Sequence, residues 1–150
     1  MTDSRLTRSQ FCTLYKKLAR RSQAWADLWY MLHLTGMMAV RLIHLCHEDV
    51  RGDSIHFPTR CRFSARVVPL TPPVRALIVR RRRDFPQDVW IFQSHSARVR
   101  SRPGPVTFIA FSQAIRHEGR GVVARTVDTR DAAELRPDND ATEPPESSDS

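Results

Sequence analysis

The sequence predicts a mainly helical α+β fold that ends in a disordered acidic tail. Apolar residues recur at helical spacing between residues 6 and 46, and short β-prone runs bounded by turn residues follow in the middle of the chain. After residue 128 the apolar content collapses in favour of Pro, Ser and acidic residues. Such a composition buries too little surface to offset the entropy of the chain. We therefore expect one domain over residues 1–127 and a disordered tail over residues 128–150.

Capping residues and apolar stripes predict the helices of the first third. An amphipathic helix is expected over Leu6–Arg20, with its apolar side chains on one face. Ser22 can cap a second helix over Gln23–Leu34, which is apolar almost all round and so belongs in the core. Gly36 ends that helix, and a third helix is expected over Ala39–Cys46.

A short antiparallel hairpin is predicted next. A turn at Arg51-Gly52-Asp53 leads into two strands, Ser54–Phe57 and Arg66–Val68. Further along, we expect a helix from Pro72 to about Arg83, a strand over Val89–Phe92, a basic loop over His95–Pro105 and a helix over Thr107–Arg116.

The charge is distributed unevenly along the chain. Residues 128–150 hold eight acidic and two basic side chains, so residues 1–127 carry a net charge of +14, against +8 for the whole chain. A small domain with this charge repels itself, which makes a polyanion the first partner to expect. Nearly all the cations are arginines, and Lys16 and Lys17 are the only lysines. The arginine fork matches phosphate, although a GC-rich genome would produce the same bias.

Several classes of protein are disfavoured by the composition. No run of about 18 apolar residues is present, and the first residues lack the apolar segment of a secretory signal. Cys12, Cys46 and Cys61 form no CxxC pair, which favours reduced thiols and the cytoplasm. His44 and His47 lie three residues apart beside Cys46, but no second ligand pair follows at a suitable spacing. We expect no metal and no cofactor.

Five segments follow one another in a distinctive order: LTRSQF, LHLTGMMAVRLIHLCHEDV, SIHFPTR, RVVPLTPPV and VWIFQS. Together they resemble the catalytic domain of the tyrosine recombinases, or phage integrases, from about Leu6 to Val122. That family has a stretch like TGLRISELLALRWEDI, a hairpin that ends in VPL and an LFPS-like segment. The resemblance implies a partial catalytic domain that binds duplex DNA. It also implies DNA recombination and integration, and origin in a mobile element such as a prophage or plasmid.

The family's phosphate-binding positions are altered in this chain. In the family, two arginines, a lysine and usually two histidines hold the scissile phosphate, whose transition state gains negative charge. Met38 occupies the position of the first arginine, and Arg60 falls near the hairpin lysine. Arginine stays protonated and so protonates a leaving oxygen poorly. Arg41, one helical turn after Met38, could reach the same phosphate.

The family's HxLRH element has one literal counterpart here. The pattern HxxR occurs as His117 to Arg120, with Gly119 in place of the packed leucine. A coincidental match is the competing interpretation.

The nucleophile of the family is a tyrosine near the C-terminus, but the only tyrosines here are Tyr15 and Tyr30. The resemblance therefore implies a truncated, degenerate member that does not cleave DNA on its own. One alternative is an accessory or decoy DNA-binding protein that pairs with an intact recombinase or with a second copy. Another is a non-functional remnant of a mobile-element recombinase. An RNA-binding module is disfavoured because no aromatic-rich strand is present.

Arginines of the hairpin and of the basic loop are the expected DNA contacts. In the loop, arginine occupies every second position, so in an extended backbone these side chains would all point to the same side. The candidates are Arg41, Arg60, Arg62, Arg66, Arg98, Arg100 and Arg102. The run Arg80–Arg83 could follow phosphates, direct nuclear import, or face the negative end of its own helix.

Overall fold

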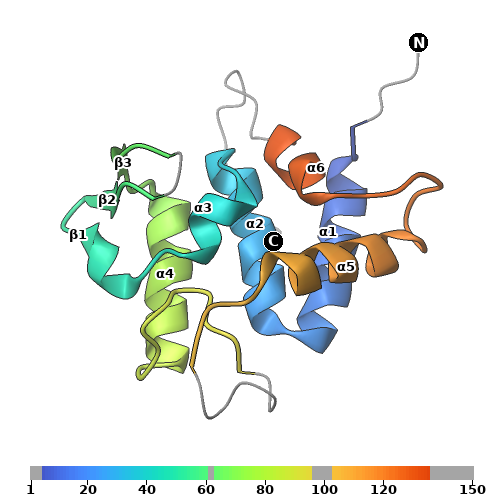
Figure 1. Cartoon of the computed structure of the whole chain (residues 1–150). Coiled ribbons are helices and arrows are strands. Elements are labelled where there is room, and N and C mark those ends of the chain that lie inside the picture. The colour runs from blue at the N-terminus through green and yellow to red at the C-terminus, as the bar shows by residue number, and fades with distance from the viewer. Residues whose placement is uncertain (1–4, 61–62, 96–102, 136–150) are drawn as a thin grey trace.

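The structure is a computed structural model, and it describes residues 5–60, 63–95 and 103–135. Within these ranges the chain forms a helical body with a small sheet at one side (Figure 1). The helices are α1 (Arg8–Arg21), α2 (Gln23–Thr35), α3 (Ala39–Ile43), the 3-10 turn η1 (His47–Asp49), α4 (Pro72–Asp84), α5 (Phe108–Gly119) and α6 (Thr129–Glu134). The strands are β1 (Val50–Arg51), β2 (Ser54–Phe57) and β3 (Arg66–Pro69). The predicted mainly helical α+β fold is confirmed.

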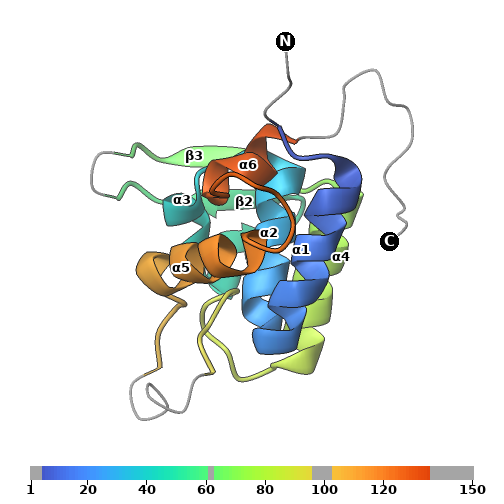
Figure 2. The same cartoon turned by 90° about the vertical axis from the view of Figure 1, so that its right-hand side faces the viewer.

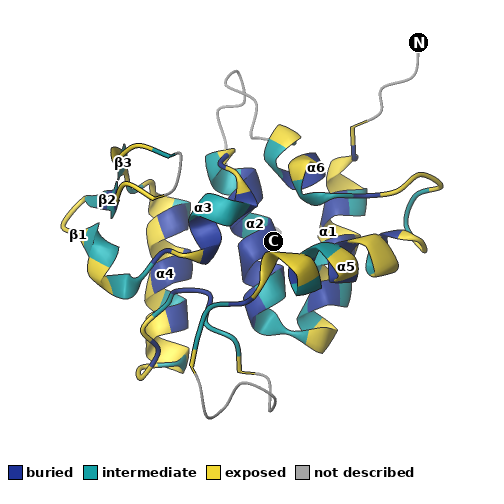
Figure 3. Ribbon diagram, in the orientation of Figure 1, coloured by how far each residue is buried: buried dark blue, intermediate teal, exposed yellow. Residues whose placement is uncertain are grey.

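Helix α2 is the central element, as its apolar character predicts. It contacts α1, α3, α4 and α6, and Figure 2 shows it surrounded by other helices. Leu28, Trp29 and Met31 are fully buried, and the Trp29 indole Nε1 donates to the Phe11 carbonyl at 3.2 Å. Figure 3 shows buried residues along α2 and on the helices around it. The core of the domain is therefore built around α2.

Local capping explains why the first two helices begin and end near their predicted positions. Thr7 caps α1 in a reciprocal capping box with Gln10, and Ser22 accepts a hydrogen bond from the Trp25 amide at the start of α2. Gly36 ends α2 in the left-handed region, at a φ of 70°. Likewise, α5 is capped by Thr107.

Helix α3 is shorter than the predicted Ala39–Cys46 because a long-range contact takes over its last residues. The Leu45 carbonyl accepts a hydrogen bond from the Ile91 amide at 3.0 Å, and Cys46 forms an isolated bridge with Trp90. These pairings draw the backbone away from the helix. The predicted strand Val89–Phe92 is wrong for the same reason, since the segment makes a single bridge and otherwise turns.

The predicted hairpin is confirmed and forms part of a three-stranded antiparallel sheet in the order β1-β2-β3. Gly52, at a φ of 59°, makes the turn between β1 and β2. Ile55 and Phe57 of β2 are buried, whereas Val67 of β3 is 60% exposed. The sheet thus covers the core with β2 and presents β3 to solvent.

The prediction that the disordered tail begins at residue 128 is wrong for residues 128–135. Asp128 caps α6 through a capping box with Asp131, and Ala132 is fully buried. Helix α6 packs against α2. The capping box, the buried Ala132 and the ion pair of Asp131 with Arg125 at 2.8 Å hold in place a segment whose average composition indicates disorder. Residues 136–150 lie outside the described residues, so the rest of that prediction is untested.

Across the described ranges, no helix is both long and apolar enough to cross a membrane.

Candidate nucleic-acid interface

Two surface hollows are lined in part by residues of α3, and both include Val40. We call the first the hairpin cleft. It has a volume of about 120 Å³ and is lined by Val40, Arg41, His44, Leu45, Phe57, Pro58, Arg60 and Phe63. We call the second the Met38 groove. It has a volume of about 410 Å³ and is lined by Gly36, Met37, Met38, Ala39, Val40, Phe108, Ser112, Asp128, Thr129, Arg130, Ala133 and Glu134.

In the hairpin cleft, the side chain of Arg60 meets that of His44. Arg60 and Phe63 exchange both backbone hydrogen bonds, at 2.9 and 2.8 Å, which fixes the chain that follows β2. The Arg60 Nη2 lies 3.2 Å from the His44 Nδ1. A guanidinium can only donate, so Nδ1 accepts and the ring proton lies on Nε2. Burial, and then the charge of Arg60, lower the pKa of His44, so its ring is neutral at pH 7.

The side chain of Arg41 also lies against the hairpin. Its Nη2 donates to the Ser64 carbonyl at 3.0 Å, and its guanidinium lies over the rings of Phe57 and Phe63, at 5.3 and 5.0 Å. Arg41 lines the hairpin cleft, whereas Met38 lines the Met38 groove. The structure therefore brings Arg41 together with Arg60, and not with Met38.

The Met38 groove has a different chemistry. Met38 is 59% exposed at the start of α3. Asp128, Arg130 and Glu134 are the charged residues of the lining, so its formal charge is −1. Arg130 itself lies 3.4 Å from the Asp128 carboxylate. This groove repels a phosphate more than it attracts one.

Sequence reasoning missed the contribution of α6 to the Met38 groove. Arg130 and Glu134 reach it only because α6 folds back onto α2. The signal that could have found this helix is the pair Asp128 and Asp131, which has the spacing of a capping box.

His117 and Arg120 lie apart from both hollows. They are exposed at the C-terminal end of α5, and neither lines the hairpin cleft or the Met38 groove. A Cβ on Gly119 would lie 2.7 Å from the Val127 Cγ2. Gly119 is therefore needed for close packing at this point. The structure does not bring this HxxR pattern together with Met38 or Arg60.

Of the other expected DNA contacts, Arg66 is exposed on β3, paired with Phe57. Arg62, Arg98, Arg100 and Arg102 lie outside the described residues.

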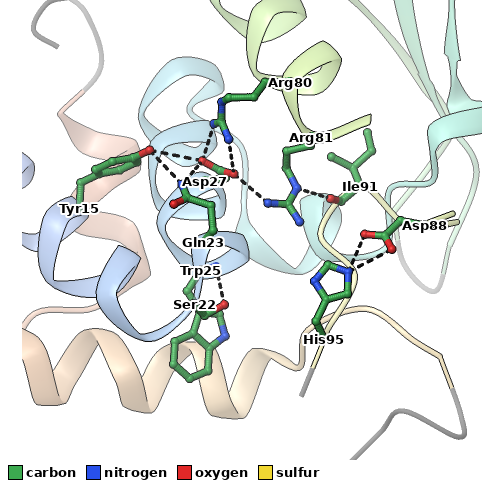
Figure 4. Close-up of polar contacts among 10 residues, drawn as sticks. All are labelled: Tyr15, Ser22, Gln23, Trp25, Asp27, Arg80, Arg81, Asp88, Ile91 and His95. Atoms are coloured by element: carbon green, nitrogen blue, oxygen red, sulfur yellow. Dashed lines mark hydrogen bonds and ion pairs between the residues drawn. The ribbon is translucent and has the colours of Figure 1, made fainter. Parts of the chain in front are cut away.

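Two arginines of the run Arg80–Arg83, the partly exposed Arg80 and the buried Arg81, pair with a buried carboxylate (Figure 4). Arg80 makes two hydrogen bonds to the Asp27 carboxylate, at 2.7 and 3.2 Å. Arg81, only 1% exposed, donates to Asp27 at 2.8 Å and to the Ile91 carbonyl at 2.6 Å. Asp27 is fully buried on α2. These two arginines neutralise a buried carboxylate, a role that sequence reasoning missed although a lone acid in an apolar helix pointed to it.

Neither tyrosine is placed as a nucleophile. The Tyr15 hydroxyl lies 3.4 Å from the Asp27 carboxylate and accepts from Gln23 at 3.2 Å. Burial, and then the Asp27 charge, raise the pKa of Tyr15, which disfavours the phenolate. The ring of Tyr30 packs against those of Phe11 and Tyr15. Both side chains contribute to the α1–α2 interface, and neither lines a hollow beside α3.

The fold is that of the recombinase and integrase class. XerA recombinase matches it with a TM-score of 0.63 at 17% identity, over 88% of this chain and 47% of that chain. Two structures of a lambda integrase dimer bound to a COC' core site match with TM-scores of 0.69 and 0.70, at 11% and 12% identity. These matches cover 90% and 88% of this chain, and 41% and 50% of the integrase chains.

The chain thus spans about half the length of the solved chains it matches. No protein-family model matches it, and no curated protein matches its sequence. The resemblance to a partial tyrosine recombinase catalytic domain is confirmed at the level of the fold.

Proposed function

We propose that this chain binds duplex DNA through α3 and the β2–β3 hairpin, and that it does not cleave the DNA. The main support is the clustering of Arg41, His44 and Arg60 in one cleft on a fold shared with integrases that were crystallised on a core site. Arg66 extends the basic surface along β3. Arginine matches phosphate oxygens in geometry as well as in charge.

The absence of cleavage is proposed from the residues that the chain does contain. Phosphoryl transfer to a tyrosine needs cations around the transition state and a placed nucleophile. Met38 supplies no charge, and Asp128 and Glu134 make the surrounding groove acidic. Tyr15 and Tyr30 are engaged between helices.

The biological setting belongs to the same proposal. The chain would derive from a mobile element, a prophage or a plasmid, and would act on DNA in the cytoplasm. As an accessory or decoy protein, it would occupy recombination sites beside an intact recombinase or a second copy. A non-functional remnant is the alternative, and it predicts no DNA affinity.

The first prediction is that DNA affinity falls steeply with salt and depends little on DNA sequence. Each phosphate contact contributes about −0.9 to the slope of log K against log salt concentration. Three to five contacts by the clustered arginines would give a slope of roughly −3 to −5. Fluorescence anisotropy of labelled duplexes, titrated from about 50 to 300 mM salt, measures this slope.

A salt slope near zero in a folded protein would contradict the proposal and favour the alternative of a non-functional remnant.

Cleavage is tested in parallel with a nicked duplex, which traps covalent recombinase–DNA intermediates. We expect no adduct that survives SDS. An adduct that disappears in Tyr15→Phe or Tyr30→Phe would refute the assignment of these side chains to helix packing.

A further inference from the structure

We propose that Arg41, His44 and Arg60 form a binding site for one phosphate group, and that His44 takes up a proton when the phosphate enters. The site is the hairpin cleft. Arg41, His44 and Arg60 line this cleft, whereas Met38 lines the Met38 groove. The proposal rests on the proposed function in one respect, namely that the phosphate comes from duplex DNA.

The size and lining of the cleft suit one phosphate. Its volume of about 120 Å³ is well below the several hundred Å³ of pockets that hold whole small-molecule ligands. Val40, Leu45, Phe57 and Pro58 supply an apolar wall, which lowers the local dielectric and strengthens a charge-assisted hydrogen bond.

The cleft offers donors that are held in place. Arg60 uses one N–H on His44, and Arg41 uses one on the Ser64 carbonyl, while each guanidinium carries five. His44 presents its Nε2–H because Nδ1 accepts from Arg60. Among the described residues, no carboxylate forms an ion pair with Arg41 or Arg60. An incoming phosphate therefore has no described internal anion to displace.

The groups around His44 favour protonation only when an anion is bound. Arg60 faces the ring from the segment after β2, and Arg41 lines the same cleft from α3. On the other side, the Cys46 thiol lies 3.8 Å from the His44 carbonyl. Burial and the charges of Asp49 and Glu48 raise the pKa of this thiol, so it stays neutral. The free site thus places the positive charge of Arg60 beside the His44 ring.

A bound phosphate reverses that balance. Its negative charge offsets Arg60 and stabilises the imidazolium, so the pKa of His44 is higher in the complex than in the free protein. Affinity then increases as the pH falls through the bound-state pKa and levels off below the free-state pKa.

The test compares Arg60→Gln and His44→Gln with Arg116→Gln, which removes a charge from the exposed face of α5. The probes are a labelled duplex of about 20 base pairs and inorganic phosphate. We expect Arg60→Gln to weaken duplex binding about tenfold and to reduce the salt slope by about one. His44→Gln should abolish most of the change in affinity between about pH 5.5 and pH 8. Arg116→Gln should leave the pH dependence intact.

NMR of the His44 ring gives a second readout on the unmodified protein. Inorganic phosphate should raise the pH midpoint of the His44 resonance, and Arg60→Gln should remove this effect. A steep salt slope that is unchanged in both variants would overturn the phosphate site and leave DNA binding standing. If duplex affinity does not depend on salt but inorganic phosphate clearly shifts the His44 resonance, the phosphate site stands and duplex DNA is not the source of the phosphate. No response to either probe would overturn both.

Discussion

Met38 is an exposed apolar residue, and the resemblance to tyrosine recombinases predicts that it occupies the position of an arginine. At 59% exposure, it faces the groove rather than the core, so a charge placed there keeps its hydration. We expect Met38→Arg to change the free energy of unfolding by less than about 0.5 kcal/mol. Duplex binding should also tighten, although Asp128 and Glu134 across the groove limit the gain. Thermal melts and anisotropy with the same duplex measure both effects.

Met37 provides the matched control, because it is the preceding residue but only 8% exposed. Met37→Arg buries an unpaired charge and should cost several kcal/mol. If Met38→Arg lowers the melting temperature as much as Met37→Arg, and DNA does not restore it, the recombinase-like placement of Met38 is wrong.

The partners of two polar residues, Asp27 and His44, could not be predicted from the sequence. Asp27 stands alone in an apolar helix, which indicates that a cation must meet it. Periodicity does not reveal which arginine does so, because the partners Arg80 and Arg81 come more than fifty residues later and from another helix. His44 was considered as a metal ligand beside Cys46 and His47. Its contact with Arg60 depends on how the hairpin folds back over α3.

At the scale of elements, the sequence predicted the helices whose ends are set by local interactions such as capping. Helices α1 and α2 begin at capping residues that the sequence displays. The end of α3 and the path of residues 89–92 depend on pairing between distant backbones, which no local pattern contains. Helix α6 was missed because average composition masked one capping box and one buried alanine.

The junction of α5 and α6 yields a prediction for packing. Gly119 approaches Val127 so closely that an added Cβ would lie 2.7 Å from its Cγ2. We expect Gly119→Ala to destabilise the fold by about 1–3 kcal/mol, as overpacked cores do. Val127→Ala removes the Cγ2 methyl group at 2.7 Å but keeps the Cβ at 2.9 Å, so it relieves only part of the conflict, at the cost of a small cavity. Denaturant unfolding of the two single variants and the double variant measures the coupling.

Because part of the conflict is relieved, the double variant should be more stable than the sum of the single effects implies, by about 0.5–1 kcal/mol. Gly121→Ala is the control, because its nearest contact is the end of the Lys17 side chain at 3.5 Å. Strict additivity between Gly119→Ala and Val127→Ala would show that Val127 does not pack against Gly119 as described.

At the scale of the whole molecule, charge separates the chain into regions of opposite sign. Residues 136–150 contain five acidic residues and one arginine, a net charge of −4, so residues 1–135 carry +12 against +8 for the whole chain. The acidic residues of the tail are Asp138, Asp140, Glu143, Glu146 and Asp149. Arg41, Arg60 and Arg66 belong to the positive region. The tail and DNA phosphates are thus potential competitors for the same cations.

We expect removal of residues 136–150 to tighten duplex binding several-fold at low salt, because the net charge of the chain then rises from +8 to +12. The difference should shrink toward zero above about 0.3 M salt, where the Debye length falls well below 10 Å. A full-length variant with the five acidic residues changed to Asn or Gln separates charge from length. If this variant binds like the truncated chain, the effect comes from charge. If it binds like the unmodified chain while the truncation still tightens binding, chain length is responsible and the electrostatic explanation is wrong.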